Sequence, residues 1–147
     1  MLLSDYNKET TKLTQVTLTE IGTDEPECLT HPRKYSCGSL KYVLRQRNLT
    51  VDRILVDGGD DGIYNKCTDE DTTDLSYLNK DVIITGLPFE SNHDVGKQTF
   101  CCHLVLSSSH NVLQGTLVFQ NLIFTENEIR LENVSVIFRN AIFKSVR

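Results

Sequence analysis

The chain contains one short phrase twice. Residues 119–124 read FQNLIF and residues 138–143 read FRNAIF, so Phe, Asn, Ile and Phe return at an offset of nineteen residues. A period near twenty is typical of solenoids, in which one repeat cannot bury its apolar face alone and stacks on a neighbouring copy. The repeated phrase therefore predicts a coil of stacked, parallel β-strands.

In such a coil, equivalent residues of successive turns lie one above the other at the inter-strand spacing of about 4.8 Å. Phenylalanines would fill the interior. An asparagine at each corner would adopt left-handed backbone geometry and hydrogen-bond to the asparagine above it. We therefore interpret the shared residues as a structural ladder and not as a binding motif. The ladder consists of Phe119, Asn121, Phe124, Phe138, Asn140 and Phe143.

Other apolar runs also have the length of strands. RILVD at 53–57 is followed by a turn-forming cluster of glycines and aspartates, and DVIITG at 81–86 reads as a second buried strand. Beyond residue 102 we expect strands to dominate, and we expect no helix after residue 90. The six strands expected there are HLVLS, TLVF, NLIF, IRLEN, VSVIF and NAIF.

The N-terminal third is less regular. Residues 1–36 are rich in polar side chains, and the alternation within TQVTLTEIG supports at most one peripheral strand. The stretch PECLTHP is predicted as a loop because prolines bracket it. Apolar residues at spacings of three and four follow Ser39, a suitable N-cap, and predict a short amphipathic helix over about 40–47. We divide the chain into a polar segment, 1–36, and a β-helical region, 37–147.

Together these elements resemble the N-terminal part of a right-handed parallel β-helix of the pectin-lyase-like superfamily. The resemblance rests on CGSL at 37–40, ILV at 54–56, VIITG at 82–86 and the two F-x-N-x-x-F phrases. It implies an all-β solenoid in which a short N-terminal helix caps the first of three or four rungs. Because the residues after Phe143 show no closing helix or strand, we also expect the solenoid to be truncated at its C-terminus.

An antiparallel β-sandwich is the alternative fold. Two similar phrases can pair as a hairpin, and short strands are equally common in sandwiches. Region 115–143 lacks the Asn-Gly and Asp-Gly turns that favour hairpins. We therefore favour the β-helix.

Cysteines and glycosylation sequons indicate the compartment. An odd number of cysteines suits a secreted domain with two disulfides and one remaining thiol, or a cytosolic protein with buried thiols. Sequons at Asn48 and Asn133 favour an extracellular or cell-surface location, with a cytoplasmic one as the alternative. The polar N-terminus cannot serve as a secretory leader, which we attribute to a truncated chain. The disulfide candidates are Cys28, Cys37, Cys67, Cys101 and Cys102.

One acidic stretch, VDGGDDGIY at 56–64, has the composition of a functional loop. Carboxylates can hold calcium, and polysaccharide-cleaving enzymes of the resembling family use paired aspartates as acid and base. The cluster is also an ordinary solvated turn, and it lies near the N-terminal end of the coil rather than on central rungs. Asp57, Asp60 and Asp61 therefore form a calcium candidate, no catalytic residue is assigned, and no other cofactor is expected.

The net charge and the lengths of the apolar runs limit the classes of partner that the chain could bind. The net charge is −5 without a basic patch, which argues against nucleic acid, and no apolar run approaches the roughly 18–20 residues that span a bilayer. The remaining partner classes are a protein or a carbohydrate ligand. We expect binding at outward residues of the repeat, where two arginines could share a face. These residues are Gln120, Arg130, Glu132 and Arg139.

No acidic pair matches Arg130 and Arg139 at the equivalent repeat positions, which weakens a catalytic interpretation. We expect a non-catalytic extracellular or cell-surface module for binding or adhesion, as part of a membrane-anchored receptor. The alternative is the N-terminal part of a carbohydrate-active enzyme, a polysaccharide lyase or hydrolase. A small cytosolic all-β protein is the third hypothesis.

Overall fold

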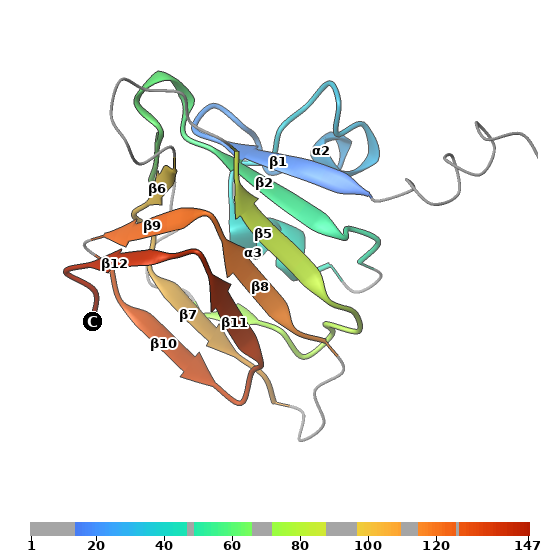
Figure 1. The fold of residues 1–147 in the computed structure, drawn as a ribbon. Coiled ribbons are helices and arrows are strands. Elements are labelled where there is room, and N and C mark those ends of the chain that lie inside the picture. Colours follow the sequence, from blue (N-terminus) through green and yellow to red (C-terminus); the bar gives the residue numbers. More distant parts are fainter. Residues whose placement is uncertain (1–13, 47–48, 66–71, 88–96, 110–114, 126) are drawn as a thin grey trace, which may run out of the picture.

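Three parallel β-sheets dominate the computed structural model, which describes residues 14–46, 49–65, 72–87, 97–109, 115–125 and 127–147 (Figure 1). The five-stranded sheet contains, in spatial order, β1 (Gln15–Thr19), β2 (Arg53–Asp57), β5 (Val82–Gly86), β8 (Leu117–Gln120) and β11 (Val136–Arg139). The four-stranded sheet contains β3 (Ile63–Tyr64), β6 (Gln98–Phe100), β9 (Leu122–Thr125) and β12 (Ile142–Lys144). The three-stranded sheet contains β4 (Thr73–Asp74), β7 (Leu104–Ser107) and β10 (Ile129–Glu132). The predicted all-β character is confirmed.

The chain visits the three sheets in a fixed order. Strands β2, β3 and β4 are followed by β5, β6 and β7 and then by β8, β9 and β10, with one strand in each sheet per turn. All nine pairings between described strands are parallel. The antiparallel sandwich is therefore wrong, and the stacked parallel sheets are compatible with a β-helix.

The number of residues per turn varies. Paired residues in the five-stranded sheet lie 38, 30, 35 and 19 positions apart, in order from β1 to β11. Only the last step has the spacing of the repeated phrase. The register is nevertheless kept throughout, because a slip of one residue would turn every inward side chain outward.

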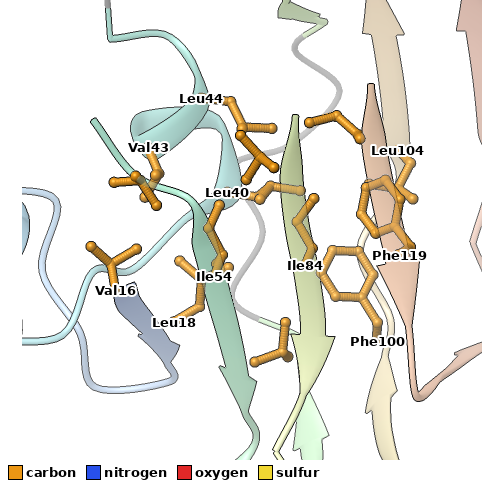
Figure 2. Packing of buried hydrophobic residues seen from close by; sticks show 14 of the residues in the cluster. Val16, Leu18, Leu40, Val43, Leu44, Ile54, Ile84, Phe100, Leu104 and Phe119 are labelled. Atoms are coloured by element: carbon orange, nitrogen blue, oxygen red, sulfur yellow. The ribbon is translucent and has the colours of Figure 1, made fainter. Parts of the chain in front are cut away.

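The interior is organised in rows of paired side chains. In the five-stranded sheet one row runs through Val16, Ile54, Ile84 and Phe119, all 0% exposed, and continues to the partly buried Phe138. Figure 2 shows members of this row together with Leu40, Val43 and Leu44. Sheets and helix thus share one hydrophobic core.

An aromatic row runs through the four-stranded sheet. Tyr64 pairs with Phe100, Phe100 with Phe124, and Phe124 with Phe143. The ring centroids are 5.6, 5.7 and 5.3 Å apart along this series. The ladder therefore extends two levels beyond the repeated phrase, to Tyr64 and Phe100, which the sequence did not reveal.

Helices are few among the described residues: α2 (Glu27–Thr30), α3 (Leu40–Leu44) and the 3₁₀ turn η1 (Gly59–Asp61). Helix α3 begins at the predicted cap, where the Ser39 hydroxyl accepts a 3.2 Å hydrogen bond from the Tyr42 amide. It ends at Leu44, earlier than expected. No described residue after 90 is helical, as predicted.

The polar N-terminal segment contributes directly to the core. Strand β1 lies at the edge of its sheet, yet Val16 and Leu18 are fully buried. Cys37 forms a parallel bridge with Leu18, donating its amide to the Thr17 carbonyl. Gly22 packs so closely that an added Cβ would lie 2.1 Å from the Cys37 carbonyl oxygen. The described part of 1–36 therefore closes one end of the stack.

Four short elements were not predicted. Helix α2 lies where the prolines predicted a loop, because Pro26 is its N-cap and proline is tolerated at a helix start. Strands β3, β4 and β6 are two or three residues long, too short for a periodic signal. Strand β4 lies at the end of a polar stretch where no strand was expected. Pairing with β7 holds it in place.

Candidate functional site

The side of the five-stranded sheet that faces away from the core forms a regular surface, which we call the outer face. Because side chains alternate along a strand, the neighbours of the buried row point to this side. They pair across the strands in two rows. The first row is Gln15, Arg53, Ile83, Val118 and Ile137, and the second is Thr17, Leu55, Thr85, Gln120 and Arg139.

The first row carries an apolar strip across β5, β8 and β11. Ile83, Val118 and Ile137 are direct register neighbours. Val118 is 7% exposed but is not part of the core cluster, whereas Ile137 at the sheet edge is 42% exposed. Polar side chains lie at both sides of the strip, including Arg53 and Gln120. The outer face thus has an apolar centre and a polar margin.

Arg53 has an unusual position on this face. Its Nε is buried and has no hydrogen-bond partner among the described residues. An unsatisfied buried donor costs about 1–3 kcal/mol. Because the atom is enclosed, an acceptor from outside would reach it only after the side chain moved.

An ion pair lies next to Arg53. Lys80 Nζ contacts Asp52 Oδ1 at 2.5 Å, and the Thr14 amide donates to Asp52 Oδ2 at 3.2 Å. The hydrogen bond from Lys80 lowers the pKa of Asp52, and it outweighs the opposing effect of burial. Asp52 is therefore already satisfied within the chain.

The four predicted outward residues separate into two groups. Gln120 and Arg139 are register neighbours on the outer face. Arg130 and Glu132 lie on β10, in the three-stranded sheet, where Arg130 Nη2 contacts Glu128 Oε1 at 2.5 Å. The expectation that Arg130 and Arg139 share a face is wrong, because β10 and β11 belong to different sheets.

The residues of the predicted ladder lie in register. Phe138 pairs with Phe119, and Phe143 pairs with Phe124. The corner asparagines Asn121 and Asn140 have φ values of 55° and 48°. Asn140 Nδ2 donates to Asn121 Oδ1 at 2.6 Å. These contacts hold successive turns together.

The acidic turn uses its carboxylates locally. Asp57 Oδ1 accepts from the Gly59 amide at 2.9 Å, and Asp61 Oδ1 accepts from the Ile63 amide at 3.1 Å. Asp60 lies between them in η1. Within the described ranges, no three acidic, histidine or cysteine side chains are grouped so that they could hold a metal ion. The described geometry adds no support for calcium.

The cysteines have different roles. Cys28 and Cys37 form a disulfide with a Cα–Cα distance of 5.1 Å. Cys102 is also disulfide-bonded, and Cys101 carries a thiol. Cys67 lies outside the described residues.

Of the two sequons, only one can be placed. Asn48 lies outside the described residues. Asn133 is an exposed corner residue with a φ of 56°, and its Nδ2 donates to the Ser108 carbonyl at 3.1 Å. The sequon hydroxyl, Ser135 Oγ, lies 3.1 Å from Thr116 Oγ1. Glycosylation at either site stays a prediction.

A polar network near α3 gave no signal in the sequence. Asp24 accepts hydrogen bonds from the amides of Gly38 and Ser39 and from the Ser39 hydroxyl, at 2.8, 2.9 and 2.7 Å. Tyr64 donates its hydroxyl to the Gly38 carbonyl. Burial, and then the nearby Asp24 and Glu20, raise the pKa of Tyr64. This network fixes the start of α3, with Ser39 and Tyr64 buried and Asp24 exposed.

Comparison of the chain with protein-family models, with characterised proteins and with solved structures finds no match. Among the described residues, no helix has the length and apolar character needed to cross a bilayer.

Proposed function

We propose that the three sheets form a right-handed parallel β-helix, as the resemblance to pectin-lyase-like proteins implies. The fixed order in which the chain visits the sheets supports this winding. Crossovers between parallel strands are right-handed in roughly 98% of cases. An experimental structure with left-handed crossovers would contradict it.

We further propose a non-catalytic extracellular or cell-surface module that binds a protein ligand through the outer face. The apolar strip beside Arg53 carries the proposal, because Ile137 is 42% exposed at the sheet edge and Ile83 is partly exposed. An apolar centre with a polar, arginine-containing margin is the usual anatomy of a protein interface. A ligand that covers Ile137 and the partly exposed Ile83 would bury apolar surface next to Arg53, whereas Val118 is already buried.

The ligand class follows from the side chains present. The two rows of the outer face contain no aromatic residue, so they lack the rings on which sugar faces commonly stack. Aliphatic side chains with arginines at the margin suit a protein surface better than a glycan.

The extracellular location rests on the Cys28–Cys37 disulfide. Structural disulfides persist in oxidising compartments and are rare in the cytosol. The two sequons agree with that location.

Substitution of Arg53 provides the central test. Arg53→Met removes a buried donor that lacks a partner, so we expect unchanged or slightly higher stability together with at least tenfold weaker binding. The probe is the fluorescently labelled protein applied to cultured cells, with bound protein measured by flow cytometry. Protease or glycosidase treatment of the cells separates protein receptors from carbohydrate receptors.

Arg130→Met is the matched control, because Arg130 lies on the three-stranded sheet. We expect it to bind like the unmodified protein. Equal binding by the Arg53 and Arg130 variants would show that the outer face is not the binding surface. Binding that survives protease but not glycosidase would identify a carbohydrate ligand instead.

A further inference from the structure

Three described strands lie at sheet edges on one side of the stack. Strands β10, β11 and β12 each lie at the edge of their sheet, and Figure 1 shows them together at the end opposite β1 and α2. No described strand pairs with their far sides. Edge strands present unpaired backbone donors and acceptors that can pair with another segment. We call this end the edge face.

Inward side chains are open to solvent at the edge face. Leu131 is 42% and Phe143 48% exposed, whereas their register partners Leu106 and Phe124 are 1% and 0% exposed. The side chains are of the same kind and differ only in whether another level covers them. The apolar side chains exposed at the edge face therefore belong to the same rows that form the hydrophobic core further inside the stack.

Backbone hydrogen bonds indicate the direction of a segment that would cover this surface. The Arg147 amide donates to the Asn127 carbonyl at 2.9 Å, and the Ile129 amide donates to the Arg147 carbonyl at 2.7 Å. Two bonds of this kind define a parallel pairing, here between Arg147 and Glu128. The far side of the three-stranded sheet thus already pairs with backbone that runs parallel to β10.

The corner asparagines indicate the composition of such a segment. Asn121 Oδ1 accepts from Asn140 Nδ2, so the amide ladder has one direction. If the ladder were continued by one more level, the asparagine of that level would donate its Nδ2 to Asn140 Oδ1. The rings of Phe138 and Phe143 stack on Phe119 and Phe124 at 5.6 and 5.3 Å, and a further level would repeat that packing.

A second copy of the chain is a poorer occupant of the edge face. Residues 128–147 contain two acidic and four basic side chains, a net charge of +2. Two edge faces in contact would bring like charges together. A neutral extended segment avoids this repulsion.

We propose that the edge face binds an extended polypeptide segment that carries a further F-x-N-x-x-F phrase, paired parallel to β11 and β12. The segment places its phenylalanines on Phe138 and Phe143 and its asparagine on Asn140. It buries the open cross-section and satisfies the free backbone groups of the edge.

A peptide of residues 115–125, GTLVFQNLIFT, carries the phrase and has no charged side chain. We expect saturable binding of this labelled peptide, lengthened by two N-terminal glutamates for solubility, to the full chain by fluorescence anisotropy. A control peptide with both phenylalanines replaced by serine should bind at least tenfold more weakly. Hydrogen exchange should slow in β11 and β12 and stay unchanged in β1 and β2.

Two protein variants locate the site. Phe143→Glu should reduce peptide affinity at least tenfold. Ile63→Glu, at an exposed position in the same sheet but on the distant strand β3, should leave it unchanged. Absence of saturation, equal binding of the control peptide, or equal effects of both variants would overturn the proposal. A stable dimer in sedimentation that Phe143→Glu dissociates would assign the edge face to a second copy and would also overturn it.

Discussion

The two ends of the stack carry similar inward side chains but differ in what covers them. At the β1 end, Val16 and Leu18 are fully buried, and Cys37 pairs with the outer edge of the strand. At the β11 end, no described segment lies over Phe143, whose ring is nearly half exposed. The difference shows that burial depends here on the neighbouring level and not on residue type. Substitutions at matched positions can test this comparison.

The largest difference in stability between matched substitutions should come from the aromatic row of the four-stranded sheet. Phe124→Ala should lower the free energy of unfolding by about 3–5 kcal/mol, because it leaves a cavity in the core. Phe143→Ala should cost only about 1 kcal/mol, since much of its ring already contacts water. Urea unfolding of both variants measures the difference. Equal losses would mean that something covers Phe143 in solution.

The disulfide at the closed end should have the next largest effect. Replacing both Cys28 and Cys37 by serine should cost about 2–3 kcal/mol, because the bond closes a loop with a sequence separation of 9. Thermal unfolding followed by circular dichroism measures the loss. Cys101→Ser is the control and should change stability by less than about 1 kcal/mol. A melting temperature that stays the same without the disulfide would show that β1 is held by packing alone.

The corner asparagines should have a smaller effect. Asn121→Ala forces alanine into the left-handed region and should cost about 1–2 kcal/mol. Asn121→Gly keeps the backbone geometry accessible and should cost less, with only the side-chain hydrogen bond lost. Chemical denaturation of both variants gives the difference. If alanine and glycine were equivalent, the positive φ would not explain the asparagine.

The Asp52–Lys80 pair should have the smallest effect, below about 1 kcal/mol, since both side chains are partly exposed. The folded state lowers the pKa of Asp52. Its contribution is therefore present above the unfolded value of about 3.9 and is lost as pH falls through the folded pKa. The stability difference between the unmodified protein and Asp52→Asn should shrink between pH 6 and pH 2. A difference independent of pH would exclude the ion pair as its cause.

Much of the fold could be predicted from the sequence where local patterns were long enough. Strand β2 has its predicted bounds, and the nineteen-residue offset corresponds to the register of β11 on β8. Tyr64 and Phe100 were missed because paired residues there are separated by 36 and then 24 positions, so no repeated spacing connects them. When the connections between paired strands differ in length, the residues of one interior row do not recur at a fixed spacing, so the sequence shows no period.

The candidate site was less predictable than the fold. Gln120 and Arg139 were found because they belong to the repeated phrase. Arg53, Ile83 and Val118 were missed, because their proximity depends on the pairing of strands that lie 30 and 35 positions apart. The assignment of Arg130 to the same face failed because it ignored the corner between β11 and β10, which are in different sheets.

The unequal spacing between paired strands has a practical consequence for engineering. Levels of the stack stay in register whether 19 or 38 residues separate them, so extra length between strands does not disturb the interior rows. Each doubling of loop length costs only about 0.6 kcal/mol in closure entropy. A peptide inserted into a connection between two strands of the stack should therefore cost little in folding free energy. This makes the chain a candidate carrier for grafted peptides.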